Sequence, residues 1–155
     1  MIRGLAGSDD ITAARGNDRI LGAAGNDRVD AGVGSDKVFG GTGNDLLEGG
    51  PGRDVLRGDK NNDTLRGDEG NDLLIGGLGS DTLQGGRGND NIQGGRGPDE
   101  ASGDQGKDRV TLGNGDDIGE YSIAENIGNR DRYDGALDST FSRYPPIVRR
   151  CSTLT

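Results

Sequence analysis

Thirteen aspartates recur at every ninth position of the chain, without one insertion or deletion between them. They are Asp9, Asp18, Asp27, Asp36, Asp45, Asp54, Asp63, Asp72, Asp81, Asp90, Asp99, Asp108 and Asp117. A carboxylate at a fixed period indicates a fixed three-dimensional repeat, and stacked repeats would also stack their negative charges. Carboxylate oxygens are ligands for hard cations, so binding of a positive ion is the chemistry that this spacing favours.

The aspartates belong to a nine-residue unit that runs in twelve copies from Gly4 to Thr111, with a degraded copy at 112–120. The unit reads G-G-x-G-x-D-x-U-x, where U is a large aliphatic residue, as in GGTGNDLLE (40–48) and GGLGSDTLQ (76–84). Its fourth position is Gly everywhere except at Asn61, and Asn is the non-glycine residue that best tolerates left-handed backbone. One aliphatic residue between mostly polar neighbours predicts a three-residue strand with its middle side chain inward. Such units bury little alone, so we expect them to stack around a thin continuous core.

The composition lies outside the range of ordinary globular domains. Hydrophobic residues make up 28% of the 155 residues, 32 residues are Gly, and the net charge is −9. Because so little apolar surface cannot offset chain entropy, we expect the chain to fold together with something positive. The acidic balance argues against nucleic acid as a partner, and no apolar run reaches transmembrane length. Cys151 has no second cysteine to pair with, and the chain has no histidine to activate a nucleophile.

On these residues the chain resembles the RTX, or haemolysin-type calcium-binding, nonapeptide-repeat family. The resemblance covers roughly residues 4–120 and implies an all-β fold. That fold is a parallel β-roll, a right-handed β-solenoid with two repeats per turn, and residues 121–155 would form a C-terminal cap and a partly flexible tail. Alternate units would then supply opposite sheets, and loops on one edge would lie 18 residues apart. We expect one edge to carry Asp9, Asp27, Asp45, Asp63, Asp81, Asp99 and Asp117, and the other to carry Asp18, Asp36, Asp54, Asp72, Asp90 and Asp108.

Calcium is the cation that such ladders favour. Carboxylates about 4.8 Å apart repel by roughly 1 kcal/mol in water and by several in a drier site, and a divalent cation between them reverses the sign. Ca²⁺ accepts six to eight oxygens in irregular geometry, so backbone carbonyls would complete its shell, whereas Mg²⁺ needs a tighter octahedron. Zinc and copper prefer nitrogen or sulfur, which these loops lack. The resemblance implies that all thirteen aspartates are calcium ligands, and the gaps between turns allow at most 11 sites.

Turn capping is the alternative for the aspartates, because an Asp side chain can accept backbone hydrogen bonds in a repeated turn. Some units also depart from the pattern. Ala13, Ala14, Ala23 and Ala31 stand where later units mostly have Gly, and each costs about 1 kcal/mol if it needs positive φ. Pro98 and Ala101 weaken unit 94–102. We therefore expect complete sites in residues 34–95, strongest from Asp36 to Asp90, and weaker or empty sites beyond them.

One sheet is predicted to carry an apolar outer stripe, made of Leu21, Phe39, Val55, Leu73 and Ile75. This stripe is either incidental exposure or a surface on which the tail or a second chain docks. In the tail, Tyr121, Ile123 and Ile127 are candidates for closing the last turn.

The functional expectation is a non-enzymatic, calcium-binding module of a secreted protein that folds when it meets calcium outside the cell. Residues 1–20 lack the apolar segment of a cleavable signal peptide, so export would use another route. One alternative is a C-terminal appendage of an exported enzyme such as a protease or lipase. Another is an adhesin or ice-binding roll, which would need a regular outward ladder, and the outward threonines form none: Thr12, Thr64, Thr82 and Thr111.

Overall fold

The computed structural model describes residues 1–120 and 132–135. This part of the chain consists of fifteen β-strands joined by short loops, and it contains no helix. No helix capable of crossing a membrane is therefore found in the described residues. The proposed cap residues Tyr121, Ile123 and Ile127, and residues 136–155 of the tail, lie outside them.

The strands form two parallel sheets. Sheet A contains, in spatial order, β1 (Ile2–Arg3), β3 (Arg19–Ala24), β5 (Lys37–Thr42), β7 (Val55–Lys60), β9 (Leu73–Leu78), β11 (Asn91–Arg96), β13 (Arg109–Asn114) and β15 (Arg132–Gly135). Sheet B contains β2 (Asp10–Thr12), β4 (Arg28–Asp30), β6 (Leu46–Glu48), β8 (Thr64–Glu69), β10 (Thr82–Arg87), β12 (Glu100–Ser102) and β14 (Ile118–Glu120).

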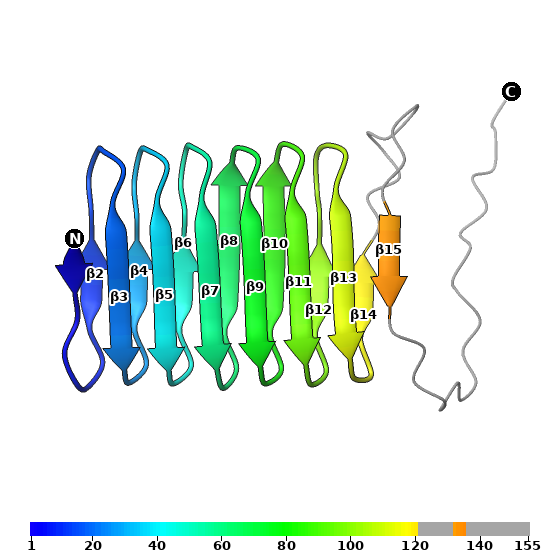
Figure 1. Ribbon diagram of the computed structural model, residues 1–155, viewed down its shortest axis with the longest axis horizontal. Helices are drawn as coiled ribbons and strands as arrows, with labels where there is room; N and C mark the ends of the chain where they lie inside the picture. The colour runs from blue at the N-terminus through cyan, green and yellow to red at the C-terminus, as the bar shows by residue number, and fades with distance from the viewer. Residues whose placement is uncertain (121–131, 136–155) are drawn as a thin grey trace, which may run out of the picture.

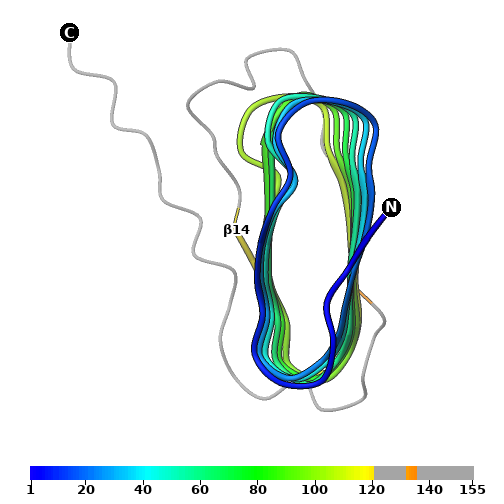
Figure 2. The same ribbon diagram turned by 90° about the vertical axis from the view of Figure 1, so that its left-hand side faces the viewer.

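Successive strands of one sheet are related by a shift of 18 residues, which is two nonapeptide units. Ile20 pairs with Val38, for example, and Val38 pairs with Leu56. The chain thus passes once through each sheet per turn and advances along a single axis (Figure 1). Viewed along that axis, the turns superimpose as a flattened closed coil whose long sides are the two sheets (Figure 2). The architecture is the β-solenoid expected from the repeat.

The strands differ in length from the expectation. Five of them have three residues, but eight have six, because pairing continues beyond the aliphatic residue into the glycines of the next unit. Gly77 pairs with Gly95, and Gly95 with Gly113, so the glycine backbones remain in register across turns. β15 adds an eighth strand to sheet A beyond residue 120, with an irregular register between Val110 and Gly113.

The core is one column of aliphatic side chains inside each sheet. The eighth residue of every unit from Ile11 to Val110 is buried, as the repeat predicts, and seven large side chains are almost completely enclosed: Ile20, Leu47, Leu56, Leu65, Leu74, Leu83 and Ile92. Each turn contributes only two such residues, so the turns gain most of their burial from their neighbours rather than from themselves.

Left-handed backbone occurs at the fourth position of every unit and at the second position of most units. Asn61 has φ 77°, as expected for the residue that replaces glycine at a fourth position. Of the four early alanines only Ala23 has positive φ, at 95°. The backbone cost considered for Ala13, Ala14 and Ala31 therefore does not arise.

Candidate metal centres

The thirteen aspartates lie in the loops between the sheets, and each one is the residue directly before the start of a strand. Loops leading from sheet A to sheet B form the A-to-B edge, which carries Asp9, Asp27, Asp45, Asp63, Asp81, Asp99 and Asp117. Loops leading back form the B-to-A edge, which carries Asp18, Asp36, Asp54, Asp72, Asp90 and Asp108. The structure thus brings the aspartates together as two ladders with 18-residue steps. The ten from Asp27 to Asp108 are buried, whereas Asp9, Asp18 and Asp117 at the ladder ends are partly exposed.

In the eleven ladder aspartates from Asp27 to Asp117, one oxygen, Oδ1, accepts a hydrogen bond from the backbone of the preceding turn. The N–H of Asp54 donates to Oδ1 of Asp72 at 2.8 Å, and the N–H of Asp72 donates to Oδ1 of Asp90 at 2.8 Å. The same bond joins every pair of ladder aspartates 18 residues apart. The turn-capping role is therefore present, but it uses only half of each carboxylate.

The other oxygen, Oδ2, is buried without a hydrogen-bond donor. Within the described part of the chain this holds for Asp27, Asp36, Asp45, Asp54, Asp63, Asp72, Asp81, Asp90 and Asp99. Leaving one buried acceptor unsatisfied costs about 1–3 kcal/mol, and more if it is charged. Native proteins contain only a few such atoms per hundred residues, so two regular rows of them mark positions at which a positively charged ligand would bind.

The Oδ2 atoms face a space that exists only because the first residue of the unit is glycine. A Cβ added to Gly67 would lie 2.6 Å from Asp72 Oδ2 and 2.5 Å from the carbonyl oxygen of Gly85 in the next turn. The backbone φ of Gly67 is one that any residue can adopt. Glycine is needed there because a side chain would not fit, and not because of backbone conformation. A carboxylate oxygen and a carbonyl oxygen from consecutive turns therefore converge on one small volume, which we call the glycine cradle.

The glycine cradle recurs along the roll, and Gly40 and Gly58 open the same space beside Asp45 and Asp63. Six aspartates combine an unpartnered Oδ2 with a convergent carbonyl oxygen: Asp27, Asp54, Asp72, Asp81, Asp90 and Asp99. At Asp9 the Oδ2 atom already accepts the N–H of Leu5 at 2.9 Å. At Asp18, Asp36 and Asp117 the first residue of the unit is Ala13, Ala31 or Leu112, so a side chain occupies the place of the cradle.

These positions differ in part from the range of complete sites expected from the sequence. Asp36 was placed inside that range, but its unit begins with Ala31, which is fully buried in the core. Asp99 was placed outside it because of Pro98, yet Gly94 leaves the cradle of Asp99 open. The first residue of each unit could have shown from the sequence which aspartates have an open cradle, because it is alanine or leucine in three units and glycine in the others.

Burial makes seven of the ladder carboxyls resist ionisation by raising their pKa. It raises the pKa of Asp63 and Asp72 from 3.8 to about 7, although a backbone hydrogen bond partly opposes it. For the same reason the pKa rises to about 6 at Asp45, Asp54 and Asp99, and it also rises at Asp81 and Asp90. Ladder neighbours contribute further: the charges of Asp90 and Asp54 both raise the pKa of Asp72. The repulsion between neighbouring carboxylates that the sequence predicts does raise the pKa of Asp72, but loss of water on burial raises it more.

A second ladder, which the sequence analysis missed, lies beside the aspartates. Oδ1 of Asn26 accepts the N–H of Asn44 at 2.8 Å, and Oδ1 of Asn44 accepts the N–H of Asn62 at 3.0 Å. Asn17, Asn62, Asn71 and Asn89 make the equivalent bond. The recurrent Asn-Asp pair was its signal. This ladder holds the loops together through neutral groups and leaves the aspartate Oδ2 atoms for another task.

The donor set available at the two edges consists of oxygen. Among residues 1–120 and 132–135, no three His, Cys, Asp or Glu side chains come close enough together to hold a metal ion. Any cation at the ladders must therefore draw on backbone carbonyls as well as on carboxylates. That combination suits a hard ion with flexible coordination, which is the preference of Ca²⁺.

Comparison with known families agrees with this geometry. A family described as the RTX calcium-binding nonapeptide repeat matches residues 3–38, 30–65, 39–74, 48–83, 57–92 and 84–118. These overlapping matches cover the roll from β1 to β14. Among curated proteins, none matches the chain in sequence.

Proposed function

The chain belongs to the RTX calcium-binding nonapeptide-repeat family, and from this premise we propose that it is a calcium-driven folding module. RTX repeats bind calcium by means of a β-roll. For this chain, the proposal is that the roll stays open when calcium is scarce and closes when calcium occupies the two ladders. Binding free energy then becomes folding free energy.

The observation that carries the proposal is the row of buried, unpartnered Oδ2 atoms, each facing a glycine cradle. In the folded chain without calcium these Oδ2 atoms lose water and gain no donor in return, so the carboxylates oppose closure of the roll. Calcium supplies the missing positive charge to the same atoms. The residues that would hold it are Asp27, Asp54, Asp72, Asp81, Asp90 and Asp99, together with the first-position carbonyl of the next turn.

The proposal sets an upper limit on the number of ions. Eleven gaps between stacked loops set the ceiling, because each gap joins two ladder aspartates. Sites whose unit begins with glycine are expected to fill first. Sites beside Asp18 and Asp36 should be weaker, since alanine takes up their space.

Circular dichroism of the purified chain at neutral pH tests the proposal directly. Calcium should produce a β-sheet signal, magnesium at equal concentration should produce much less, and a chelator should remove the signal. The choice of ion matters because Mg²⁺ needs near-octahedral geometry and keeps its water. A chain that is fully folded in chelator at neutral pH would contradict the mechanism.

The proposed role is accessory and not catalytic. Support comes from the sequence, which has no histidine, and from the buried position of the ladder carboxylates, which are enclosed rather than presented to a substrate. RTX repeats are typical of secreted proteins, and we propose that this chain meets its calcium outside the cell. Comparing calcium-dependent folding at cytosolic and extracellular calcium concentrations checks this: folding at both would argue against a calcium switch between compartments.

The ice-binding alternative lacks the regular threonine surface that it would need. Thr64 and Thr82 are neighbours on sheet B, but Thr12 stands apart from them and Thr111 belongs to sheet A. The ladder that such a surface needs is therefore only two residues long.

A further inference from the structure

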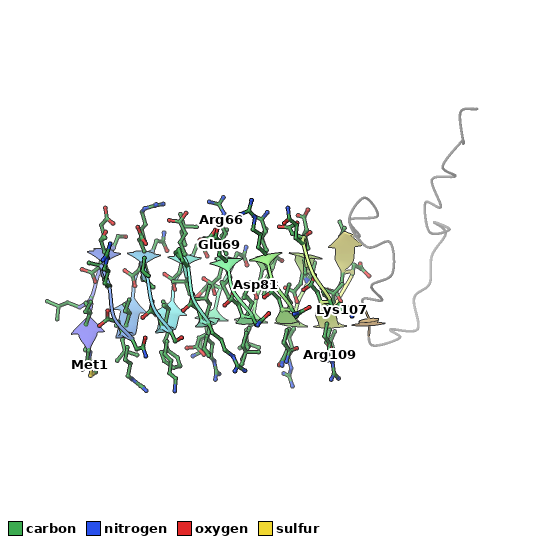
Figure 3. The ribbon with its side chains drawn as sticks, turned by 90° about the horizontal axis from the view of Figure 1, so that it is seen from above. Met1, Arg66, Glu69, Asp81, Lys107 and Arg109 are labelled. Carbon is green, nitrogen blue, oxygen red and sulfur yellow. The ribbon has the colours of Figure 1, made fainter. Side chains whose placement is uncertain are left out.

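The two sheets differ in the charge of their outer surfaces. The described outward and rim side chains of sheet A, on β1 to β13, are called the basic face and include a single acid, Asp59, and seven cations: Arg3, Arg19, Lys37, Arg57, Lys60, Arg96 and Arg109. On sheet B the described side chains comprise six acids and three arginines: Asp10, Asp30, Glu48, Asp68, Glu69 and Glu100, with Arg28, Arg66 and Arg87. Arg109 projects on one side of the roll, and Arg66 and Glu69 project on the other (Figure 3). The chain-wide charge of −9 conceals this separation.

The cations of the two sheets also differ in their partners. All three arginines of sheet B are in ion pairs: Arg28 and Arg66 contact Glu48 at 2.6 and 3.1 Å, and Arg87 contacts Glu69 at 3.1 Å. On the basic face, Arg57 pairs with Asp59, and the Arg19 guanidinium lies 5.0 Å from the centre of the Phe39 ring. Within the described residues the remaining basic-face cations form no ion pair, so they are available to an anion from outside.

A groove runs across the basic face. It has a volume of about 730 Å³ and is lined by Thr42, Arg57, Asp59, Lys60, Leu78, Arg96 and Asn114, with Gly41, Gly77 and Gly95 leaving backbone exposed between them. The one acid in this lining, Asp59, is ion-paired with Arg57, which leaves Lys60 and Arg96 as the unpaired charges of the groove. Thr42, Lys60, Leu78, Arg96 and Asn114 are register partners on five successive strands. At about 4.8 Å per strand, this wall extends for roughly 20 Å along the roll. The groove therefore has the length and direction to receive one extended polymer chain.

Calcium loading strengthens this preference for an anion, and this step rests on the proposed function. The chain carries −9 and the thirteen ladder carboxylates contribute −13, so all other groups together carry +4. Calcium neutralises the ladders, and the surface that remains is positive overall, with most of its unpaired cations on one face. Two calcium-loaded copies would repel each other where their basic faces met, which disfavours the basic face of a second copy as the occupant of the groove.

From these observations we infer that the groove of the basic face binds a linear acidic polysaccharide when the roll is loaded with calcium. Lys60 and Arg96 would meet acidic groups, Thr42 and Asn114 would meet hydroxyl groups, and Leu78 with the half-buried apolar side chains beside the groove would contact sugar rings. Single-stranded nucleic acid fits less well, because base stacking needs open aromatic faces. The one aromatic residue on the described part of this face, Phe39, is covered by Arg19.

The test uses the full chain and fluorescently labelled dextran sulfate, with uncharged dextran as the matched ligand control. Binding is followed by fluorescence anisotropy in saturating calcium and in chelator, and calcium-dependent folding is recorded on the same samples. The variant K60Q/R96Q removes two cations from the groove. The control variant R53Q/K107Q removes two cations from exposed loop positions, so both variants have the same net charge.

The inference predicts that dextran sulfate binds only the calcium-loaded chain and that dextran does not bind. K60Q/R96Q should weaken binding about five- to tenfold and fold with calcium as the parent does, whereas R53Q/K107Q should stay within about twofold, because it spares the contacts in the groove. Binding should also weaken as salt is raised.

Three outcomes overturn the inference: no binding by a chain that folds in calcium, equal weakening by both variants, or tighter groove-dependent binding of single-stranded oligothymidylate than of dextran sulfate. A salt-sensitive dimer in sedimentation that K60Q/R96Q abolishes would also overturn it, in favour of a second copy. Failure to fold in calcium would instead refute the proposed function.

Discussion

Replacing Asp72 by asparagine separates the two roles that one ladder carboxylate performs. Asparagine keeps an Oδ1 atom, so it can still accept the N–H of Asp54. It replaces the unpartnered Oδ2 by an amide nitrogen, which can donate to the carbonyl of Gly85 that faces the same cradle. An amide nitrogen cannot bind calcium. The substitution is therefore expected to stabilise the calcium-free roll and to weaken the calcium-loaded one.

The size of the first effect follows from the pKa of Asp72, which burial raises from 3.8 to about 7. Between these two values the folded state binds more protons than the unfolded state, so this carboxyl weakens the fold progressively as pH rises through that range. At 1.36 kcal/mol per pKa unit, its ionised form costs the calcium-free roll about 4 kcal/mol above pH 7. A few such carboxylates would cancel the 5–15 kcal/mol that stabilises a typical domain, which is why we expect the apo chain to be open at neutral pH.

Two measurements follow the effects of D72N. In chelator, the pH at which the β-sheet signal appears on acidification should move upward, because one opposing charge is gone. In calcium, isothermal titration should lose one binding event, and the calcium needed for half-folding should rise. Asp30 on the outer face of β4 is the matched control, since D30N removes the same charge away from both ladders.

The direction of the stability change caused by D72N in chelator decides whether the reasoning holds. If D72N destabilises the roll in chelator as much as in calcium, Oδ2 is not an unpaired, ion-seeking atom and the carboxylate is only a turn cap. Unchanged calcium stoichiometry would lead to the same conclusion.

Other consequences concern the cradle, protons and the core. G67A should remove one calcium in titration by placing a methyl group against Asp72 Oδ2, and A31G should add one by opening the cradle beside Asp36; equal stoichiometry in both would show that the cradle is not the site. Calcium affinity should fall as pH is lowered through 7 to 6, since protons take the same raised-pKa oxygens, and a calcium affinity independent of pH over this range would exclude that competition. L65A should cost the calcium-loaded roll about 2–5 kcal/mol in denaturant unfolding, because Leu65 is fully enclosed in the core column; a loss below about 1 kcal/mol would mean that neighbouring turns collapse into the space.

Much of the fold could be predicted because the repeat is strictly periodic. An unbroken nine-residue frame fixes which residue is inward in every unit, and the buried column from Ile11 to Val110 follows it without exception. Asn61 could be predicted to adopt left-handed backbone for the same local reason. Strand length could not be predicted from the repeat. It depends on whether the glycines of adjacent turns form backbone pairs, which is a property of the contact between turns and not of one unit.

The candidate sites were predicted by residue but not by atom. The sequence identified thirteen aspartates, and it could not distinguish calcium ligation from turn capping, since both need a carboxylate in a turn. The structure assigns Oδ1 to capping and leaves Oδ2 unpartnered at nine positions. It also distinguishes Asp36 from Asp99 through the first residue of each unit, which lies five positions earlier in the chain but in contact range in space.

The sequence by itself thus determined the period, the inward residues, the two families of aspartates and the kind of ion that their oxygens favour, because each of these depends on residue type and spacing alone. Only the tertiary structure decided which oxygen of each carboxylate is free, which cradles are open and where the cations of an acidic chain collect. Those properties depend on what the neighbouring turn places opposite a given atom, 18 residues away along the chain and about one strand spacing away in space.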